Sequence, residues 1–257
     1  MTPRVVTTAA AWQAELAGHR AAGLTVGFVP TMGALHPGHA SLFHHALREC
    51  DVVLASVFVN PTQFDEAQDF EKYPRTLDAD LALMGAAGVD VVFTPSVAEM
   101  YPEGRTYSVH ESALSRELCG AHRPGHFSGM LTVVLKLLQI AGANRAYFGE
   151  KDYQQLQLVR GLVRAFFLPT EIVACPTVRE PDGLAMSSRN ARLSPAERAL
   201  APQFHAALSS TTTSTTEVSA RLAAAGFGVD YIEDRDGRRF GAVRLGSTRL
   251  IDNVPLT

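Results

Sequence analysis

Two histidines, His36 and His39, stand three residues apart in the segment PTMGALHPGHASL, where a strand-like run gives way to a helical pattern. A helix N-terminus presents unpaired backbone N–H groups and positive dipole potential, so it suits phosphates. Two imidazoles there can donate hydrogen bonds to the same phosphate, and Gly33 lets the backbone approach a ligand closely. Zinc-binding pairs of the HExxH type need a spacing of four residues and an intervening glutamate, which are absent here. The pattern therefore favours phosphate binding over a metal site or two incidental surface histidines.

Amide and guanidinium side chains occupy two further loops. Asn60 and Gln63, in FVNPTQF, could hold a polar substrate through uncharged hydrogen bonds, although a satisfied turn fits this pattern better. Arg123, in RPGHF, could pair with a phosphate or a carboxylate. A surface arginine explains that position equally well, so these residues alone do not define a site.

Charged and hydroxyl side chains cluster in two later segments. In FGEKDYQQL, Lys151 suits a phosphate and Asp152 suits ribose hydroxyls. In DGLAMSSRN, the donors Ser187, Ser188 and Arg189 could wrap triphosphate oxygens. Taken singly, each pattern is also typical of a solvated helix start or loop.

The elements that must position these residues alternate along the first two-thirds of the chain. Apolar, β-branched runs predict strands at 24–30, 51–59, 89–95, 145–148 and 171–178, and helical spacing predicts helices at 38–50, 75–88, 127–142 and 152–167. Such alternation predicts an α/β fold, a doubly wound parallel sheet with helices on both faces. Ligands of such sheets bind at the carboxyl ends of the strands, near the point where strand order reverses.

The composition changes after about Arg192. A cap at Ser194 with Glu197 three residues later predicts a helix over 194–208. The Ser/Thr-rich run 209–219 predicts a flexible or frayed segment. Short β-type segments follow, with a hairpin at Gly246–Ser247, so a small α+β unit is expected at the C-terminal end.

Composition excludes several classes of protein. Over 257 residues, 23 Lys and Arg against 26 Asp and Glu give a net charge of −3, which argues against a general nucleic-acid binder. No apolar stretch reaches the roughly 18 residues of a membrane span, and the N-terminus lacks a signal-peptide pattern. Three cysteines without CxxC spacing indicate reduced thiols and a cytoplasmic protein. No GxGxxG, GxxxxGK[ST] or GxSxG motif is present, so any phosphate site depends on the histidine pair and the helix start.

Seven segments, in this order, resemble the pantothenate synthetase (pantoate–β-alanine ligase) family: PTMGALHPGHASL, FVNPTQF, YPRTLDADL, RPGHF, FGEKDYQQL, AMSSRN and RLIDN. The resemblance runs from about residue 4 to 193 and resumes at 229–253. The HxGH element alone would imply only the wider nucleotidylyltransferase superfamily. The ordered set of seven is far more specific.

The resemblance implies a two-step reaction. The carboxylate of (R)-pantoate attacks the α-phosphate of ATP, giving pantoyl adenylate and pyrophosphate, and the amine of β-alanine then displaces AMP to form pantothenate. It implies Mg²⁺ on the phosphates, a homodimer, and no nucleic-acid or membrane partner. It also implies a Rossmann-like catalytic domain at 1–180 and a small, shortened α+β lid domain at 181–257.

The resemblance also assigns residues by motif. Catalytic roles fall on His36, His39, Lys151 and Arg189, with His39 as the family's proton donor. The residues that would bind ATP are Met32, Gly33, His36, His39, Gly149, Lys151, Asp152, Val178, Met186, Ser187, Ser188 and Arg189. Pantoate and β-alanine would contact Gln63 and Gln155, with Asn60, Tyr73 and Arg123 as further candidates. The acidic segment that the family places near Mg²⁺ here reads Asp78-Ala79-Asp80, and no protein ligand to the metal is assigned.

Two other functions fit part of the pattern. A different adenylyltransferase would use the same scaffold with another acid or phosphate acceptor, and Gln63 and Gln155 argue against it because they match the pantoate pocket. A nucleotide-binding relic without activity is the second alternative. The intact His36, His39 and Lys151 argue against such decay.

Overall fold

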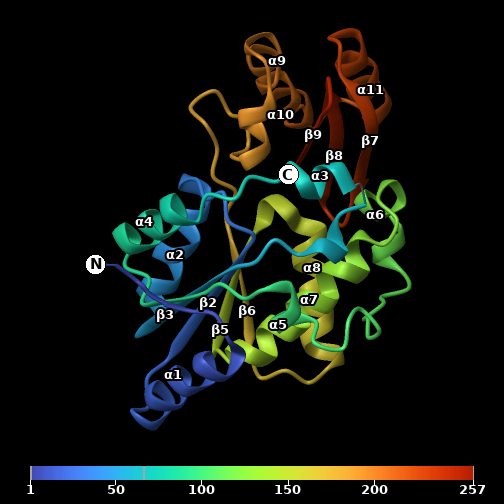
Figure 1. The fold of residues 1–257 in the computed structure, drawn as a ribbon. Coiled ribbons are helices and arrows are strands. Elements are labelled where there is room, and N and C mark those ends of the chain that lie inside the picture. The colour runs from blue at the N-terminus through green and yellow to red at the C-terminus, as the bar shows by residue number, and fades with distance from the viewer. Residues whose placement is uncertain (1, 66, 257) are drawn as a thin grey trace. The chain divides into compact units, whose positions relative to one another are not determined.

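The computed structural model describes residues 2–65 and 67–256, and within them six strands form one parallel sheet (Figure 1). These strands are β1 (Arg4–Val6), β2 (Val26–Thr31), β3 (Val52–Val57), β4 (Val91–Phe93), β5 (Arg145–Gly149) and β6 (Glu171–Cys175). Their order is β1-β4-β3-β2-β5-β6, and every pairing is parallel. The predicted doubly wound parallel sheet is therefore confirmed.

Helices cover both faces of this sheet (Figure 1). Helix α2 packs against α4 on one face, and α1 packs against α7 on the other. The helices of this part of the chain are α1 (Ala9–Ala21), α2 (Pro37–Glu49), α3 (Ala67–Glu71), α4 (Leu77–Ala87), α5 (Val97–Met100), α6 (Cys119–His122), α7 (His126–Ala141) and α8 (Tyr153–Ala165), with 3₁₀ turns η1 (Pro61–Gln63) and η2 (Leu114–Arg116).

The central strands are apolar along their whole length because both of their faces are covered. In β3 all of Val52–Ser56 is buried, and β2 is buried except at Pro30. Phe43 and Ala46 of α2 pack with Val53 and Tyr147 in the core between sheet and helix. This packing holds the carboxyl ends of β2 and β3 in fixed positions.

Strand order reverses beside β2, which pairs with β3 on one side and β5 on the other. The chain from β2 moves outward through β3 and β4, whereas from β5 it moves outward through β6. The loop after β2, which starts at Met32, and Gly149 at the end of β5 therefore lie at the switch point where doubly wound sheets bind ligands.

The C-terminal part of the chain forms a second compact unit, which comprises Glu150–Tyr153 and the residues from Pro176 onward, while the first unit resumes over Gln154–Cys175. Its antiparallel sheet has the order β7-β8-β9, with a core that includes Phe204, Leu208, Val218 and Val243. Its elements are η3 (Glu150–Asp152), η4 (Ser188–Arg192), α9 (Pro195–Leu200), α10 (Pro202–Leu208), α11 (Thr215–Ala224), β7 (Gly228–Arg235), β8 (Arg238–Leu245) and β9 (Thr248–Pro255). The small α+β unit and the hairpin at Gly246–Ser247 are confirmed.

Two expectations for this unit were wrong in detail. The single helix expected over 194–208 is two helices, because Pro202 has no N–H to continue the hydrogen bonds of α9. The segment expected to be flexible over 209–219 contains the start of α11. Ser214 accepts a hydrogen bond from the Glu217 N–H at 3.3 Å, and the Glu217 carboxylate accepts one from the Ser214 N–H at 3.1 Å. This reciprocal cap starts a helix in a polar run whose buried residues are Val218 and Leu222.

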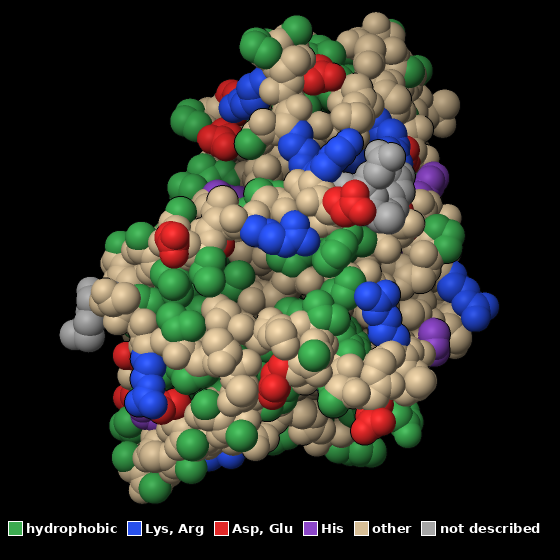
Figure 2. Space-filling model, in the orientation of Figure 1, with side chains coloured by type: hydrophobic (Ala, Val, Ile, Leu, Met, Phe, Trp, Pro, Cys, Tyr) green, Lys and Arg blue, Asp and Glu red, His purple; other side chains and the backbone are tan. Residues whose placement is uncertain are grey.

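The surface and the thiols match the composition. On the face drawn in Figure 2, basic, acidic and apolar side chains are interspersed. In the described part of the chain no helix is long and apolar enough to cross a bilayer. Cys50, Cys119 and Cys175 are thiols and form no disulfide.

Candidate active site

The two histidines of HPGH meet at the start of α2. His36 is the N-cap residue, Pro37 opens the helix, and His39 follows in its first turn. The rings of His36 and His39 lie 4.1 Å apart between centroids. The His36 N–H donates to Nδ1 of His39 at 3.3 Å. An imidazole whose Nδ1 accepts carries its proton on Nε2, so His39 presents a fixed N–H donor at the helix N-terminus.

A buried carboxylate holds the loop that precedes this helix. Asp80 of α4 is 2% exposed. Its oxygens accept hydrogen bonds from the N–H of Ala34 at 3.1 Å and of Leu35 at 2.8 Å, and from Thr76 Oγ1 at 3.2 Å. Gly33 and Ala34 both have positive φ, and a Cβ at Gly33 would lie 2.9 Å from Asp80 Oδ2. Glycine and the Asp80 clamp together fix the turn between Met32 and His36.

Met32, Asn60 and Gln63 are brought together. Gln63 is 9% exposed, and its Nε2 donates to the Met32 sulfur at 2.9 Å while its Oε1 accepts from Asn60 Nδ2 at 3.1 Å. Asn60 is fully buried, and its Oδ1 accepts from Tyr101 at 2.8 Å and from Thr62 Oγ1 at 2.9 Å. The Asn60 side chain makes its hydrogen bonds inside the protein, and one of these bonds orients Gln63.

Arg123 lies beside the same turn. Its guanidinium donates to Asp65 Oδ1 at 2.7 and 3.0 Å and contacts His126 Nε2 at 3.2 Å. His126 Nδ1 donates to the Gln63 carbonyl at 2.7 Å. Burial raises the pKa of the Asp65 carboxyl, but the hydrogen bond and charge of Arg123 outweigh it, so this pKa lies below its ordinary value.

The remaining candidates in the first unit occupy different settings. Tyr73 is 5% exposed, and its ring packs edge-on against Phe64 at 5.6 Å. The Gln155 side chain is half-buried on α8 and makes no hydrogen bond to any residue that the structure describes, whereas the side chain of its neighbour Gln154 is buried and bonds three backbone groups. Gly149 ends β5, and a Cβ there would meet open space.

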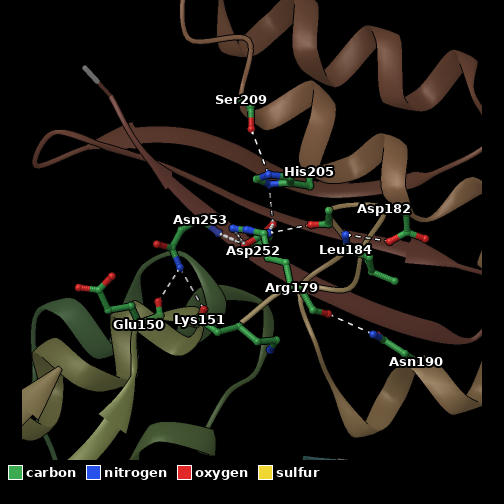
Figure 3. A network of polar contacts seen from close by, with 12 residues as sticks. Glu150, Lys151, Arg179, Asp182, Leu184, Asn190, His205, Ser209, Asp252 and Asn253 are labelled. Atoms are coloured by element: carbon green, nitrogen blue, oxygen red, sulfur yellow. Dashed lines mark hydrogen bonds and ion pairs between the residues drawn. The ribbon is translucent and has the colours of Figure 1, made fainter. Parts of the chain in front are cut away.

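In the second unit, the segment Glu150–Asp152 forms η3. Lys151 Nζ lies 3.8 Å from Asp152 Oδ1, and the side chains are 20% and 46% exposed. Their backbone is tied to β9, where Asn253 Nδ2 donates to the carbonyls of Glu150 and Lys151 (Figure 3). The structure therefore pairs these two residues and anchors them at the main chain.

The segment 178–189 of the same unit forms a tight turn followed by a 3₁₀ helix. The Met186 N–H donates to the Val178 carbonyl at 3.0 Å. Ser187 caps η4 by accepting from the Arg189 N–H at 3.2 Å, and Ser188 opens that helix. The two ends of the segment are thus brought together, with Ser187–Arg189 at the start of a turn of helix.

Three residues that support these groups were not assigned a role from the sequence. Asp80, His126 and Asn253 hold the loop after β2, the turn at Gln63 and the backbone of η3. Each lies inside a quoted motif, but its partner lies 45 to 103 residues away along the chain. Only membership of a motif could have indicated them, because spacing gives no sign of contacts over such separations.

Comparison with known proteins identifies the family of this chain. The family model described as pantoate-beta-alanine ligase matches residues 4–255. A pantothenate synthetase of Bdellovibrio bacteriovorus is 52% identical over 246 residues, which cover 96% of this chain and 95% of that protein.

Solved structures give the same result. A pantoate-beta-alanine ligase of Francisella tularensis, complexed with beta-gamma ATP and beta-alanine, superposes with a TM-score of 0.93 at 41% identity, covering 98% of this chain and 97% of that one. A pantothenate synthetase of Thermus thermophilus gives 0.89 at 44% identity, covering 98% and 99%. Both solved structures align with this chain over nearly their whole length. Since the match extends over nearly the entire chain in sequence and in fold, the protein belongs to the pantoate-β-alanine ligase family.

Proposed function

We propose that this chain catalyses the ATP-dependent ligation of (R)-pantoate and β-alanine to pantothenate, with release of AMP and pyrophosphate. The carboxylate of pantoate attacks the α-phosphorus of ATP, the bond to pyrophosphate breaks, and pantoyl adenylate forms. The β-alanine amine then attacks the acyl carbon, and AMP leaves. The observation that carries the proposal is the family match over residues 4–255, joined to a histidine pair at a helix N-terminus.

In the first step, His39 is proposed to donate a hydrogen bond to a phosphate of ATP. Two anions must meet in that step, so negative charge on the phosphates has to be stabilised. The Nε2–H of His39 and the N-terminus of α2 supply donors without a covalent intermediate. His36, which sets the tautomer of His39 through its own N–H, is proposed to contact the same phosphates, and Met32 and Gly33 to line the nucleotide.

Gln63 is proposed to hold pantoate and then β-alanine. Its Nε2 donates to a thioether sulfur, which is a weak acceptor, so a substrate oxygen is a better partner for the same N–H. Asn60 orients this amide by donating a hydrogen bond to its oxygen. Gln155 is proposed as the second pantoate residue, with Tyr73 and Arg123 shaping the pocket wall.

Lys151 is proposed to bind ATP phosphates and Asp152 the ribose. An ammonium on a flexible stem suits a phosphate, and a carboxylate accepts from ribose hydroxyls. Gly149 and Val178 are proposed to contact ATP through their backbone. Met186, Ser187, Ser188 and Arg189 are proposed to close over the phosphates, with Arg189 offering a bidentate donor set.

Mg²⁺ is proposed to enter as the MgATP complex. Within residues 2–65 and 67–256, no group of three His, Cys, Asp or Glu side chains is arranged to hold a metal. Asp80, in the acidic segment, already accepts hydrogen bonds from two backbone N–H groups and a threonine. We therefore assign the cation to the phosphates of the substrate.

Three features follow from family resemblance and stay predictions. They are a homodimer, a cytoplasmic location that fits the three thiols, and a lid role for residues 181–257. The mass of the particle in solution tests the first. Protection of the second unit from limited proteolysis by a non-hydrolysable ATP analogue tests the third.

The proposed reaction is tested by omission. Protein is mixed with ATP, Mg²⁺, (R)-pantoate and β-alanine, and AMP is measured with one component left out at a time. AMP that needs all four supports the ligase. Pyrophosphate exchange with pantoate alone, without AMP from the full mixture, would place the fault in the second step. Absence of both would favour another acid substrate or a nucleotide-binding relic.

A further inference from the structure

The motif RLIDN ends in a side chain that has no part in the reaction as proposed above. Asn253 of β9 is 2% exposed. Its Nδ2 donates to the carbonyl oxygens of Glu150 at 2.8 Å and Lys151 at 3.0 Å (Figure 3). One amide group therefore uses both of its N–H bonds on consecutive carbonyls of η3.

The orientation of this amide is fixed by a cation. Arg238 Nε donates to Asn253 Oδ1 at 2.9 Å, so the oxygen faces the guanidinium and the NH₂ faces the two carbonyls. Arg238 also lies over the ring of Tyr153 at 4.2 Å and near Glu150 Oε2 at 3.9 Å. Arg238 thus contacts the side chain of the first residue of η3 and that of the residue that follows η3, while Asn253 holds the main chain of η3.

The backbone of Asn253 is held in turn by its neighbour. Asp252 is 4% exposed, and its Oδ1 accepts from the Asn253 N–H at 2.8 Å. The same carboxylate receives a bidentate pair from Arg179 at 2.7 and 3.0 Å and lies 3.3 Å from His205 Nδ1 (Figure 3). A buried, charge-assisted cluster of this kind leaves the Asn253 side chain little freedom.

We infer that Asn253 is a positioning residue for ATP binding, because it sets the backbone from which Lys151 projects. The inference rests on the proposed phosphate role of Lys151. An ammonium on a long stem is worth more to a phosphate when the start of the stem is fixed, and small displacements of a binding group are costly. Asn253 itself does not touch the nucleotide in this account.

An isosteric variant tests the two hydrogen bonds. Asn253→Asp keeps the volume and the contact with Arg238, but it replaces the NH₂ by an oxygen that faces two carbonyl oxygens. We expect the Kd for ATP, measured by calorimetric titration of the full chain, to rise about 10- to 100-fold. Asn253→Ala, which removes the donors without adding charge, should weaken ATP in the same direction and serves if the first variant folds poorly.

A double-mutant cycle separates positioning from general damage. If Asn253 acts through Lys151, then Asn253→Asp in a Lys151→Ala background should change the Kd for ATP by no more than about twofold. The matched control is Asp234→Asn, which breaks the bidentate pair with the buried Arg239 on β7 and β8 of the same unit. It should lower the melting temperature and leave the Kd for ATP unchanged.

The readout distinguishes this inference from the proposed reaction, because ATP binding is measured without pantoate or β-alanine. Additive losses in the cycle, or a loss of ATP affinity in Asp234→Asn that matches the loss in Asn253→Asp, would overturn the inference while leaving the ligase assignment intact. A wild-type protein that binds ATP but yields no AMP would overturn the ligase assignment, and the cycle would still decide the role of Asn253.

Discussion

The tautomer of His39 is set by a neighbouring backbone group, which occupies one of its two ring nitrogens. The His36 N–H lies 3.3 Å from His39 Nδ1, and the proton therefore sits on Nε2. The same kind of control recurs at Gln63, where Asn60 donates to the amide oxygen and Nε2 donates to the Met32 sulfur. At the residue scale, His39 and Gln63 are neutral donors whose orientation is set by hydrogen bonds from His36 and Asn60.

Removing the imidazole of His39 tests this directly. His39→Ala is expected to lower kcat by about 10²–10³-fold, the usual loss for one donor to a developing charge. The matched control is His44→Ala, on the exposed face of the same helix, which should keep wild-type turnover. Near-normal turnover in His39→Ala would refute the role assigned to it.

Replacing Asp80 tests whether its carboxylate holds the loop after β2. In Asp80→Asn, one of the two backbone N–H groups of the loop, at Ala34 or Leu35, faces an NH₂ instead of an oxygen. We expect the free energy of unfolding to fall by about 1–3 kcal/mol and kcat/KM for ATP to fall about 10- to 100-fold as the loop shifts.

The control for this variant lies two residues away on α4. Asp78 is exposed, so Asp78→Asn should leave the activity and the melting temperature as they are. Equal effects of the two substitutions would show that the charge of α4, and not the clamp on the loop, matters.

The helices and strands that the sequence predicts are those with a clear hydrophobic pattern. The apolar runs that became β2, β3 and β5, and the helical spacing of α2 and α7, identify buried elements because hydrophobic pattern follows burial. Two helices with local caps, α1 and α11, were missed. Thr8 caps α1 and Ser214 caps α11, in Ala-rich and Thr-rich stretches where the apolar pattern is weak.

Hydrophobic periodicity does not predict the residues that hold the candidate site in place. Asn253 contacts a segment 102 and 103 residues earlier in the chain. Asp80 reaches back 45 and 46 residues. Such pairings depend on the final packing of elements, so the motifs predict candidate site residues but not the residues that hold them.

Helix α7 packs closely against η1 at Gly129, where a side chain would meet the backbone of η1. A Cβ at Gly129 would overlap the Thr62 carbonyl and lie 2.8 Å from the Gln63 backbone nitrogen. Gly129→Ala must therefore push η1 away from α7 and move Gln63. We expect a lower melting temperature together with a raised KM for pantoate.

Gly161 in α8 provides the comparison, since a Cβ there meets nothing within 4 Å. Gly161→Ala should be neutral or stabilise the protein by about 0.5–1 kcal/mol. If Gly129→Ala left the KM for pantoate at its wild-type value, Gln63 would not be the pantoate residue.

At the scale of the whole molecule, each of the two units depends on carboxylates that must stay ionised. Burial raises the pKa of Asp252, but His205 and Arg179 outweigh it, and the pKa lies below its ordinary value. Asp65 follows the same logic, with burial opposed by Arg123. A carboxyl whose folded pKa is lowered contributes stability above its unfolded pKa of about 4, and this stability is lost as pH falls through the folded pKa.

The melting temperature should therefore vary little between about pH 5 and 8 and fall steeply below about pH 4. Asp252→Asn should be less stable at pH 7, by about 2–5 kcal/mol, with a shallower loss on acidification. Denaturant titrations from pH 7 to pH 3 measure both slopes. Parallel curves for wild type and variant would mean that Asp252 does not contribute to the acid response.

An oxygen label decides whether pantoate is activated as an acyl adenylate. Pantoate with ¹⁸O at both carboxylate oxygens is supplied with ATP, Mg²⁺ and β-alanine, and the products are analysed by mass spectrometry. We expect one ¹⁸O in each AMP, because the attacking carboxylate oxygen leaves with the phosphorus. Unlabelled AMP, or ADP accompanied by labelled inorganic phosphate, would contradict it.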